Sequence, residues 1–309
     1  MTKLDEILEN KRREIERAKR AVPLEELKEM IQSRAGTEGM AGAMAVATAG
    51  ATAIPTASAG VLAGASAVLD DPASPGRFSR ALRAKAPYAL IGEIKRASPS
   101  KGVIISGVDP GAWASLYERS GAAAVSVLTD TRFFHGSLDD LREAKAACSI
   151  PVLRKDFIVD PYQVYETAAA GADAFLLILA AVGGSGAVRL LALGRELGLE
   201  ALVEIHTIAE LEDLLRHEAE VPKQADMAPA RAEVVGINNR DLGSFTTSLA
   251  VTCEIAPRVP KGRIIVSESG IFSREDAATV RRAGAHALLV GEALMRSPEP
   301  GLKIGELIS

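Results

Sequence analysis

The chain has 309 residues, enough for one large domain or two ordinary ones, and its hydrophobic content of 48% supports a sizeable core. A net charge of −4 gives no electrostatic reason to expect nucleic acid as a partner. Two cysteines, Cys148 and Cys253, and four dispersed histidines form no metal-binding or redox motif. We therefore expect a reduced, cytoplasmic protein that uses no metal and no other cofactor.

The N-terminal region, residues 1–33, predicts one or two amphipathic helices. Apolar residues recur there at helical spacing, namely Leu4, Ile7, Leu8 and Ile15. The stretch from Lys11 to Arg20 is locally basic, but Glu14 and Glu16 alternate with the basic residues, which is typical of a solvated helix face. The region lacks the apolar core of a signal peptide, so we expect no leader.

Residues 34–72 form an Ala/Gly-rich insertion of low complexity. No residue between Gly39 and Leu69 is charged, and this length would permit a membrane span. Small residues dominate the segment, however, and Pro55 lies in its middle, so little would be gained by transfer into lipid. We expect a flexible insertion that is mobile or loosely packed from about residue 37 to 67, and no membrane association.

Residues 73–309 alternate between short apolar runs and stretches of helical periodicity, after a short predicted helix that ends near residue 85. Eight runs predict strands, at 87–95, 122–130, 150–156, 172–179, 200–205, 233–239, 263–270 and 286–294. Gly121, Gly171 and Gly284 precede strands and fit helix C-caps. The pattern predicts an α/β protein, a (β/α)8 TIM barrel; a doubly wound open sheet is the main alternative.

Ionisable, amide and hydroxyl side chains gather at the carboxyl ends of these predicted strands: Glu93, Lys95, Thr129, Asp130, Lys155, Asp156, Glu204, Asn238, Arg240, Glu268 and Ser269. Alternate residues of a strand share a face, so Glu93 and Lys95 point to the same side. Buried charges are costly unless they neutralise one another or meet a charged ligand. A structural ion-pair layer is one interpretation; the number of charges at one rim favours an active site.

The last two predicted strands end in turns that contain Ser269-Gly270 and Gly291. In this fold the loops after strands 7 and 8 commonly bind phosphate through backbone N–H groups at a helix start. We expect these turns to expose such N–H groups to a phosphorylated small molecule. Glycines that only serve the turns are the alternative.

Seven motifs resemble, in order, those of the indole-3-glycerol phosphate synthase family of tryptophan biosynthesis: IGEIKRASPSKG, SVLTDTRFFHGSLDDL, PVLRKDFIVDPYQVYE, ALVEIHT, VGINNRDL, IIVSESGI and LLVGEALM. The N-terminal stretch ILENKRREIERAKRAVPLEEL also resembles the extra helices that precede the barrel in that family. The resemblance covers nearly the whole chain except roughly residues 34–72 and a shorter stretch around 223–231. The second stretch would lengthen a connection remote from the chemistry.

The resemblance implies a ring closure in which 1-(2-carboxyphenylamino)-1-deoxyribulose 5-phosphate loses carbon dioxide and water. Lys155 matches the general acid, and a desolvated site beside a second cation would lower its pKa toward the working pH. Lys95 matches the residue that meets the substrate carboxylate. Glu204 and Glu93 match the carboxylates that stabilise positive charge and transfer protons, and Asn238 matches a positioning residue.

The resemblance also implies the substrate-binding residues, which are Ser98, Phe134, Phe157, Arg240, Glu268, Ser269, Gly270 and Gly291. Ser98 belongs to a mobile loop that would cover the substrate, with Lys101 as a further charge, and Phe134 and Phe157 would sandwich the anthranilate ring. A Schiff-base aldolase or sugar-phosphate isomerase with Lys155 as nucleophile remains an alternative, as does a non-catalytic scaffold. Beyond the phosphorylated substrate, no obligate protein partner is expected.

Overall fold

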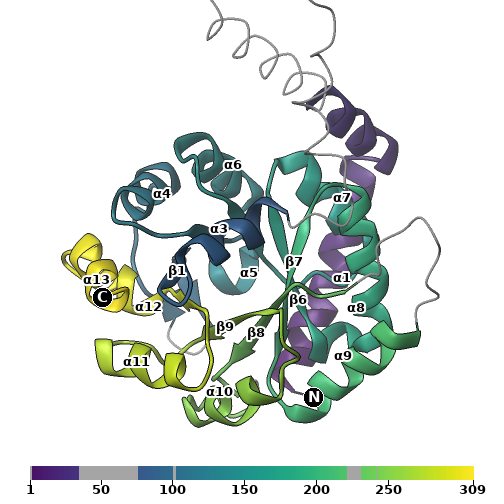
Figure 1. Cartoon of the computed structure of the whole chain (residues 1–309). Helices are drawn as coiled ribbons and strands as arrows, with labels where there is room; N and C mark the ends of the chain where they lie inside the picture. The colour runs from purple at the N-terminus through teal and green to yellow at the C-terminus, as the bar shows by residue number, and fades with distance from the viewer. Residues whose placement is uncertain (1, 35–75, 100–101, 221–230, 242) are drawn as a thin grey trace, which may run out of the picture.

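The computed structural model describes residues 2–34, 76–99, 102–220, 231–241 and 243–309 (Figure 1). The predicted insertion, residues 34–72, falls almost wholly outside these ranges. The segment expected to be mobile, the span considered for a membrane helix and Lys101 lie outside them too. Within the described ranges, no helix is long and apolar enough to cross a membrane.

Eight parallel strands close into a barrel, as predicted, and the open-sheet alternative is wrong. The strands are β1 (Ala89–Ile94), β4 (Ala124–Leu128), β5 (Val152–Lys155), β6 (Ala174–Ile178), β7 (Glu200–Ile205), β8 (Val234–Asn238), β9 (Ile264–Glu268) and β10 (Ala287–Val290). Closure is visible at β1, where Ile91 is in register with Ala124 of β4 on one side and with Leu289 of β10 on the other.

Helices surround the barrel and connect successive strands (Figure 1). The predicted ones are α4 (Pro110–Arg119), α6 (Leu138–Ala147), α7 (Pro161–Ala170), α8 (Leu179–Glu196), α9 (Ile208–Glu220) and α11 (Arg274–Arg282). The structure adds α5 (Thr131–Phe134), α10 (Ala250–Ile255), a 3-10 turn (Ala256–Arg258), α12 (Glu292–Met295) and α13 (Pro300–Leu307), mostly too short to show a period. Two short strands, β2 (Ala97–Ser98) and β3 (Gly102–Val103), pair in the loop after β1.

Strand alternation separates two apolar layers. Ile91, Leu176 and Leu202 pack inside the barrel, whereas Leu90 and Phe175 belong to the layer between the strands and the helices. Both layers are fully buried, so the barrel interior is a packed core rather than a pore. The inner apolar layer stops short of the carboxyl ends of the strands, where the charged residues begin.

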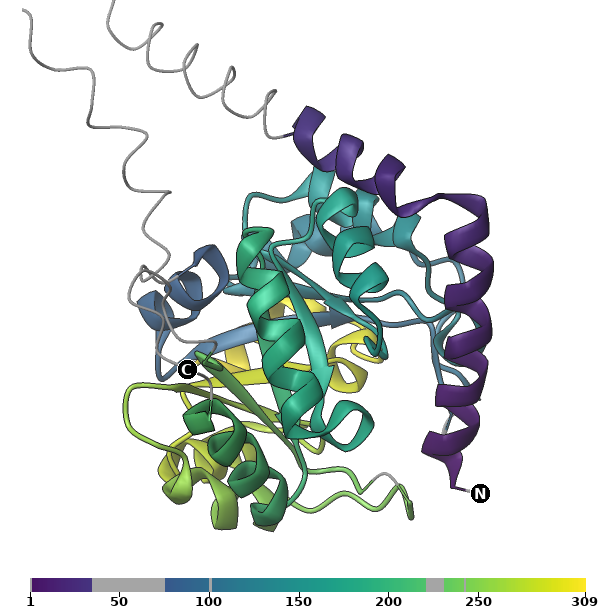
Figure 2. The same cartoon turned by 90° about the vertical axis from the view of Figure 1, so that its right-hand side faces the viewer.

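Two helices before the barrel cover its opposite ends (Figure 2). Helix α3 (Arg77–Lys85) closes the end where the strands begin, with Phe78 and Leu82 completely buried in the inner layer. Helix α1 (Lys3–Ala21) starts with a capping box and crosses the end where the strands finish. Residues 24–34 are also helical, so the predicted N-terminal helices are confirmed.

We predict that Phe78→Ala lowers the free energy of unfolding by about 3–5 kcal/mol, because loss of the buried ring leaves a cavity between α3 and the barrel that the rigid strands cannot fill. Denaturant unfolding followed by circular dichroism measures the change. Leu302→Ala is the control: its side chain is 68% exposed, so the expected loss is below about 0.5 kcal/mol. Equal losses in the two variants would contradict the role assigned to α3.

Candidate active site

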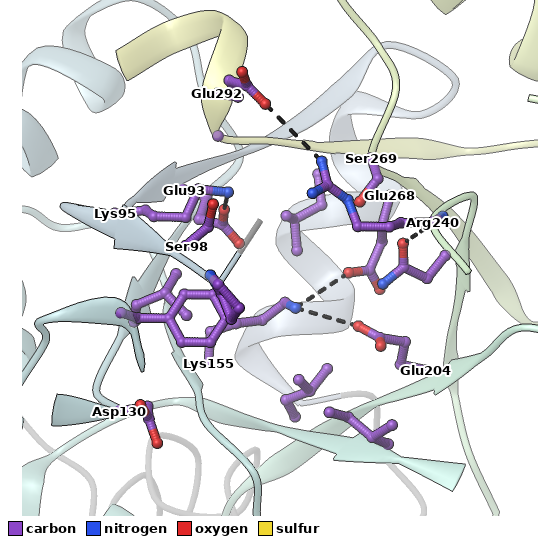
Figure 3. A pocket seen from close by; sticks show the side chains of 18 of the residues that line it. Glu93, Lys95, Ser98, Asp130, Lys155, Glu204, Arg240, Glu268, Ser269 and Glu292 are labelled. Atoms are coloured by element: carbon purple, nitrogen blue, oxygen red, sulfur yellow. Dashed lines mark hydrogen bonds and ion pairs between the residues drawn. The ribbon is translucent and has the colours of Figure 1, made fainter. Parts of the chain in front are cut away.

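A pocket opens where the strands end, beneath helix α1 (Figure 3). All thirteen residues that the sequence analysis proposed line it together: Glu93, Lys95, Ser98, Phe134, Lys155, Phe157, Glu204, Asn238, Arg240, Glu268, Ser269, Gly270 and Gly291. Lys3, Leu4 and Ile7 of α1 complete one wall. The predicted convergence of the strand ends is therefore observed, and the N-terminal helix takes part in the pocket.

Lys155 at the end of β5 lies in the middle of the charged group (Figure 3). Its Nζ lies 3.2 Å from Glu204 Oε2 and 3.6 Å from Glu268 Oε2. Burial by itself lowers the pKa of Lys155, but Glu204, Glu268 and Glu93 outweigh burial and raise the pKa well above the ordinary lysine value. The expected lowering is therefore wrong, because carboxylates rather than a second cation surround the ammonium.

Glu204 and Glu268 share this environment, but their pKa values shift in opposite directions. Burial opposes ionisation of Glu204, yet Lys155 and nearby hydrogen-bond donors, including the Asn238 amide, lower its pKa. Burial and the charge of Glu204 raise the pKa of Glu268 well above the ordinary value. The two shifts run in opposite directions: the surroundings favour the charged form of Glu204 and oppose ionisation of Glu268.

A second ion pair lies across the pocket on β1. Glu93 Oε1 is 2.5 Å from Lys95 Nζ, which confirms that the two side chains share a face. Burial would raise the pKa of Glu93, but Lys95 and Lys155 lower it, so Glu93 is ionised. Gly291 leaves room for the pair in this position: a Cβ there would lie 2.3 Å from Glu93 Oε1 and 3.1 Å from Lys95 Nζ, so the two side chains would have to shift.

A second glycine, Gly236, makes room for the carboxyl group of Glu268. A Cβ on Gly236 of β8 would lie 2.1 Å from Glu268 Oε1, far inside van der Waals contact. Gly236 is in register with Glu204 of β7, and β9, which carries Glu268, pairs with β8 on its other side. A larger side chain at 236 would therefore occupy the barrel interior between Glu204 and Glu268. Charged groups at the strand ends thus require small residues opposite them.

The turns after β9 and β10 form the far side of the pocket. Ser269 and Gly270 both have positive φ, 65° and 78°, and the buried Asn239 amide holds the turn by donating to the carbonyls of Glu268 and Ser269. Gly291 is the N-cap of α12. Ser269-Gly270 do not start a helix, contrary to the prediction, because α11 begins at Arg274.

The remaining predicted binding residues come from loops. Phe134 of α5 and Phe157 after β5 place their ring centroids 6.3 Å apart at an interplanar angle of 45°. Arg240 Nη2 lies 3.9 Å from Glu292 Oε2 (Figure 3). The buried hydroxyl of Ser98 finds no hydrogen-bond partner in the described parts of the chain, as expected of a group that meets a ligand.

His206 lies next to Glu204 and was not among the residues predicted from the sequence. Its Nε2 lies 3.4 Å from Glu204 Oε1 and its Nδ1 lies 3.6 Å from Glu210 Oε2. Burial lowers the pKa of His206, but Glu210 and Glu204 raise it above the ordinary value. The sequence could have indicated it, because His206 follows Glu204 by two residues and alternate residues of a strand share a face.

The described residues contain no group of three or more His, Cys, Asp or Glu side chains arranged to hold a metal ion. The polar groups that line the pocket are ammonium and carboxylate groups, with an amide, a guanidinium and two serine hydroxyls. Such groups can hold an anionic organic molecule and move protons within it. The fold and this site define a (β/α)8-barrel enzyme of acid–base chemistry.

Comparison with known proteins identifies the enzyme family to which the chain belongs. Residues 53–307 match the family model described as indole-3-glycerol phosphate synthase. A protein of that name from Roseiflexus sp. (strain RS-1) is 49% identical over 75% of this chain and 85% of its own, and one from Variovorax paradoxus (strain S110) is 40% identical over 98% of both. The chain belongs to the indole-3-glycerol phosphate synthase family, whose members are carboxy-lyases.

A solved structure of low sequence identity shares the fold. 3-Hexulose-6-phosphate synthase from Salmonella typhimurium aligns with a TM-score of 0.53 at 13% identity, over 71% of this chain and 96% of its own. At this identity the likeness concerns only the barrel. The assignment to a family therefore rests on sequence.

We predict that Gly291→Ala lowers kcat by about tenfold or more, because the added methyl group displaces Glu93 and Lys95 from their pair. Steady-state kinetics measures the effect. The matched control is Gly305→Ala in α13, where a Cβ meets nothing within 4 Å. If Gly291→Ala kept the activity of Gly305→Ala, the geometry of the Glu93–Lys95 pair would not matter for turnover.

Proposed function

We propose that this protein catalyses the conversion of 1-(2-carboxyphenylamino)-1-deoxyribulose 5-phosphate to indole-3-glycerol phosphate, carbon dioxide and water. Membership of the family supports the reaction. The observation that carries the proposal is a buried ammonium, Lys155, held between Glu204 and Glu268 opposite the Glu93–Lys95 pair. That arrangement supplies a proton donor beside carboxylates that can stabilise positive charge, and the ring closure needs both.

The substrate has three parts, and the pocket offers a matching group for each. The anthranilate ring would lie between Phe134 and Phe157, with its carboxylate at Lys95. The phosphate would lie at the turns that contain Gly270 and Gly291, near Arg240. The ribulose carbonyl would then lie between these ends, at Lys155. Binding both ends fixes the ring carbon close to the carbonyl that it attacks.

Ring closure forms a bond between the carboxylate-bearing ring carbon and the carbonyl carbon. The carbonyl π electrons move to oxygen, which takes a proton from Lys155 and becomes a hydroxyl. Positive charge develops on the anilino nitrogen, and the ionised Glu204 and Glu93 lower its energy. Loss of carbon dioxide then returns an electron pair to the ring and restores its aromatic character.

Dehydration completes the indole. The hydroxyl leaves as water with a second proton, and the carbon next to nitrogen loses one proton, which we assign to Glu204. Two protons are supplied and one is recovered, so each turnover consumes one proton overall. Glu268, whose pKa is raised and whose Oε2 lies 3.6 Å from Lys155 Nζ, is placed to return protons to the site between steps.

The raised pKa of Lys155 separates acid catalysis from a Schiff-base mechanism. A nucleophilic lysine must be neutral, and Glu204, Glu268 and Glu93 oppose loss of its proton. A general acid must start protonated, which the same carboxylates secure. Treatment with borohydride in the presence of substrate checks this directly: we expect no covalent adduct at Lys155.

The proposed reaction is tested by incubating the protein with the carboxyphenylamino-deoxyribulose phosphate and following the appearance of indole fluorescence. Turnover with release of one carbon dioxide per indole formed supports the proposal. Absence of turnover by protein of native circular dichroism and melting behaviour would overturn it.

We predict that Lys155→Met lowers kcat by about 10²–10⁴-fold or more, because the carbonyl oxygen loses its proton donor. Binding of the substrate should change much less, since Lys95 and the phosphate turns remain. Single-turnover kinetics gives the rate of the chemical step, and its dependence on substrate concentration gives the affinity for the substrate. Wild-type kcat in this variant would remove Lys155 from the mechanism.

A further prediction concerns Glu204→Gln, which keeps the size of the side chain but removes its charge. The charge matters most as the anilino nitrogen becomes positive, so kcat should fall by about 10²-fold or more while KM changes little. Steady-state kinetics with the same substrate provides both constants. A change confined to KM would make Glu204 a binding group and Glu93 the leading catalytic carboxylate.

A further inference from the structure

A second buried cluster of charges lies beneath helix α1, at the edge of the pocket, which Asp130 and Asp156 also line. Lys11 is 3% exposed, and the sequence-based expectation of a solvated helix face is wrong at this residue. Its Nζ lies 2.8 Å from Asp130 Oδ2, 2.8 Å from Asp156 Oδ1 and 2.7 Å from Glu14 Oε2. One ammonium from the N-terminal helix thus meets two barrel carboxylates that are themselves buried.

Each of the two aspartates holds the backbone of a segment that carries a pocket aromatic. Asp130 is the N-cap of α5, and its Oδ1 accepts from the N–H of Phe133, next to Phe134. Asp156 Oδ1 accepts from the N–H of Phe157 at 2.8 Å. The ion pairs of Lys11 therefore connect the α5 segment and the end of β5 to each other and to α1.

The two aspartates repel each other without this ammonium. Burial raises the pKa of Asp130, Lys11 lowers it and the charge of Asp156 raises it again, with a net result above the ordinary value. Asp156 has a second cation in Arg154, at 3.1 Å, and receives a hydrogen bond from Thr129. Asp130 has no other cation within ion-pair distance among the described residues, so its place beside Asp156 depends on Lys11.

We propose that Lys11 is a positioning residue for substrate binding: by bridging Asp130 and Asp156, it fixes the separation and tilt of Phe134 and Phe157, the walls of the slot for the anthranilate ring. This inference rests on the proposed function, since the ring is part of the proposed substrate. Lys11 itself lies behind the slot and bonds the two aspartates rather than the pocket contents. Its effect reaches the substrate through the two aspartates, which line the pocket, and through the two aromatic rings that they hold.

The same helix supplies a matched control. Lys19 of α1 also bonds the barrel domain, with its Nζ 2.9 Å from Asp160 Oδ2 at the N-cap of α7. That bond docks the helix but holds neither Phe134 nor Phe157. If Lys11 acted only by holding α1 in place, its loss and the loss of Lys19 would affect the enzyme in the same way.

The test compares Lys11→Met, Lys11→Arg and Lys19→Met with the wild type. The probe is the alcohol made by borohydride reduction of the substrate carbonyl, which keeps the anthranilate ring and the phosphate but cannot cyclise. Its dissociation constant, read from anthranilate fluorescence, and KM should rise about tenfold or more in Lys11→Met, with a smaller fall in kcat. Lys11→Arg should recover most of the affinity, and Lys19→Met should stay within about twofold of wild type.

Two results would overturn the inference: Lys11→Met binding the alcohol as tightly as wild type, or Lys19→Met weakening binding as much as Lys11→Met. If Lys11→Met does not fold, Asp130→Asn takes its place, because asparagine keeps the N-cap bond to Phe133 but loses the charge; unchanged affinity there would equally contradict the inference. Wild-type turnover of the substrate is measured first, so that failure of the proposed reaction is recognised separately.

Discussion

The neutralisation of buried charge at one end of the barrel governs the rest of this structure. An ammonium removed from water is tolerated only when carboxylates meet it at close range, and Lys155 has Glu204 and Glu268 within 3.6 Å. Parallel strands make this possible because all of them end at the same rim with the same alternation of faces. Gly236 and Gly291 leave the space that the carboxylates occupy. The inner apolar layer below and α3 beneath it hold the rim in place.

Two charged clusters meet at the end of β5. Lys155 points into the pocket, whereas the next residue, Asp156, points toward α1 and bonds Lys11. Since neighbouring residues of a strand face opposite sides, the strand end connects the chemistry of the pocket with the docking of the N-terminal helix. The helix therefore contributes more than a cover: it supplies a wall through Leu4 and Ile7 and a charge through Lys11.

Much of this was predictable from sequence. The eight apolar runs, their order and the gathering of polar residues at strand ends followed from periodicity, and the motifs identified thirteen pocket residues that the fold brings together. The direction of the pKa shift of Lys155 was not predictable, because it depends on which charges lie nearest in space. The burial of Lys11 was not predicted for a related reason: a basic residue beside Glu14 looks solvated on a helix, and only the fold brings Asp130 and Asp156 next to it.

The central claim is that carboxylates keep Lys155 charged and ready to donate a proton. Its most direct test is the pH titration of the Lys155 ε-carbon by NMR, with ε-13C-lysine incorporated throughout and the signal assigned by its loss in Lys155→Met. A folded-state pKa raised by Glu204, Glu268 and Glu93 predicts that this signal stays at the ammonium position beyond the ordinary lysine value of 10.5, until the protein unfolds. Deprotonation of Lys155 below about pH 9 in the folded enzyme would contradict the claim.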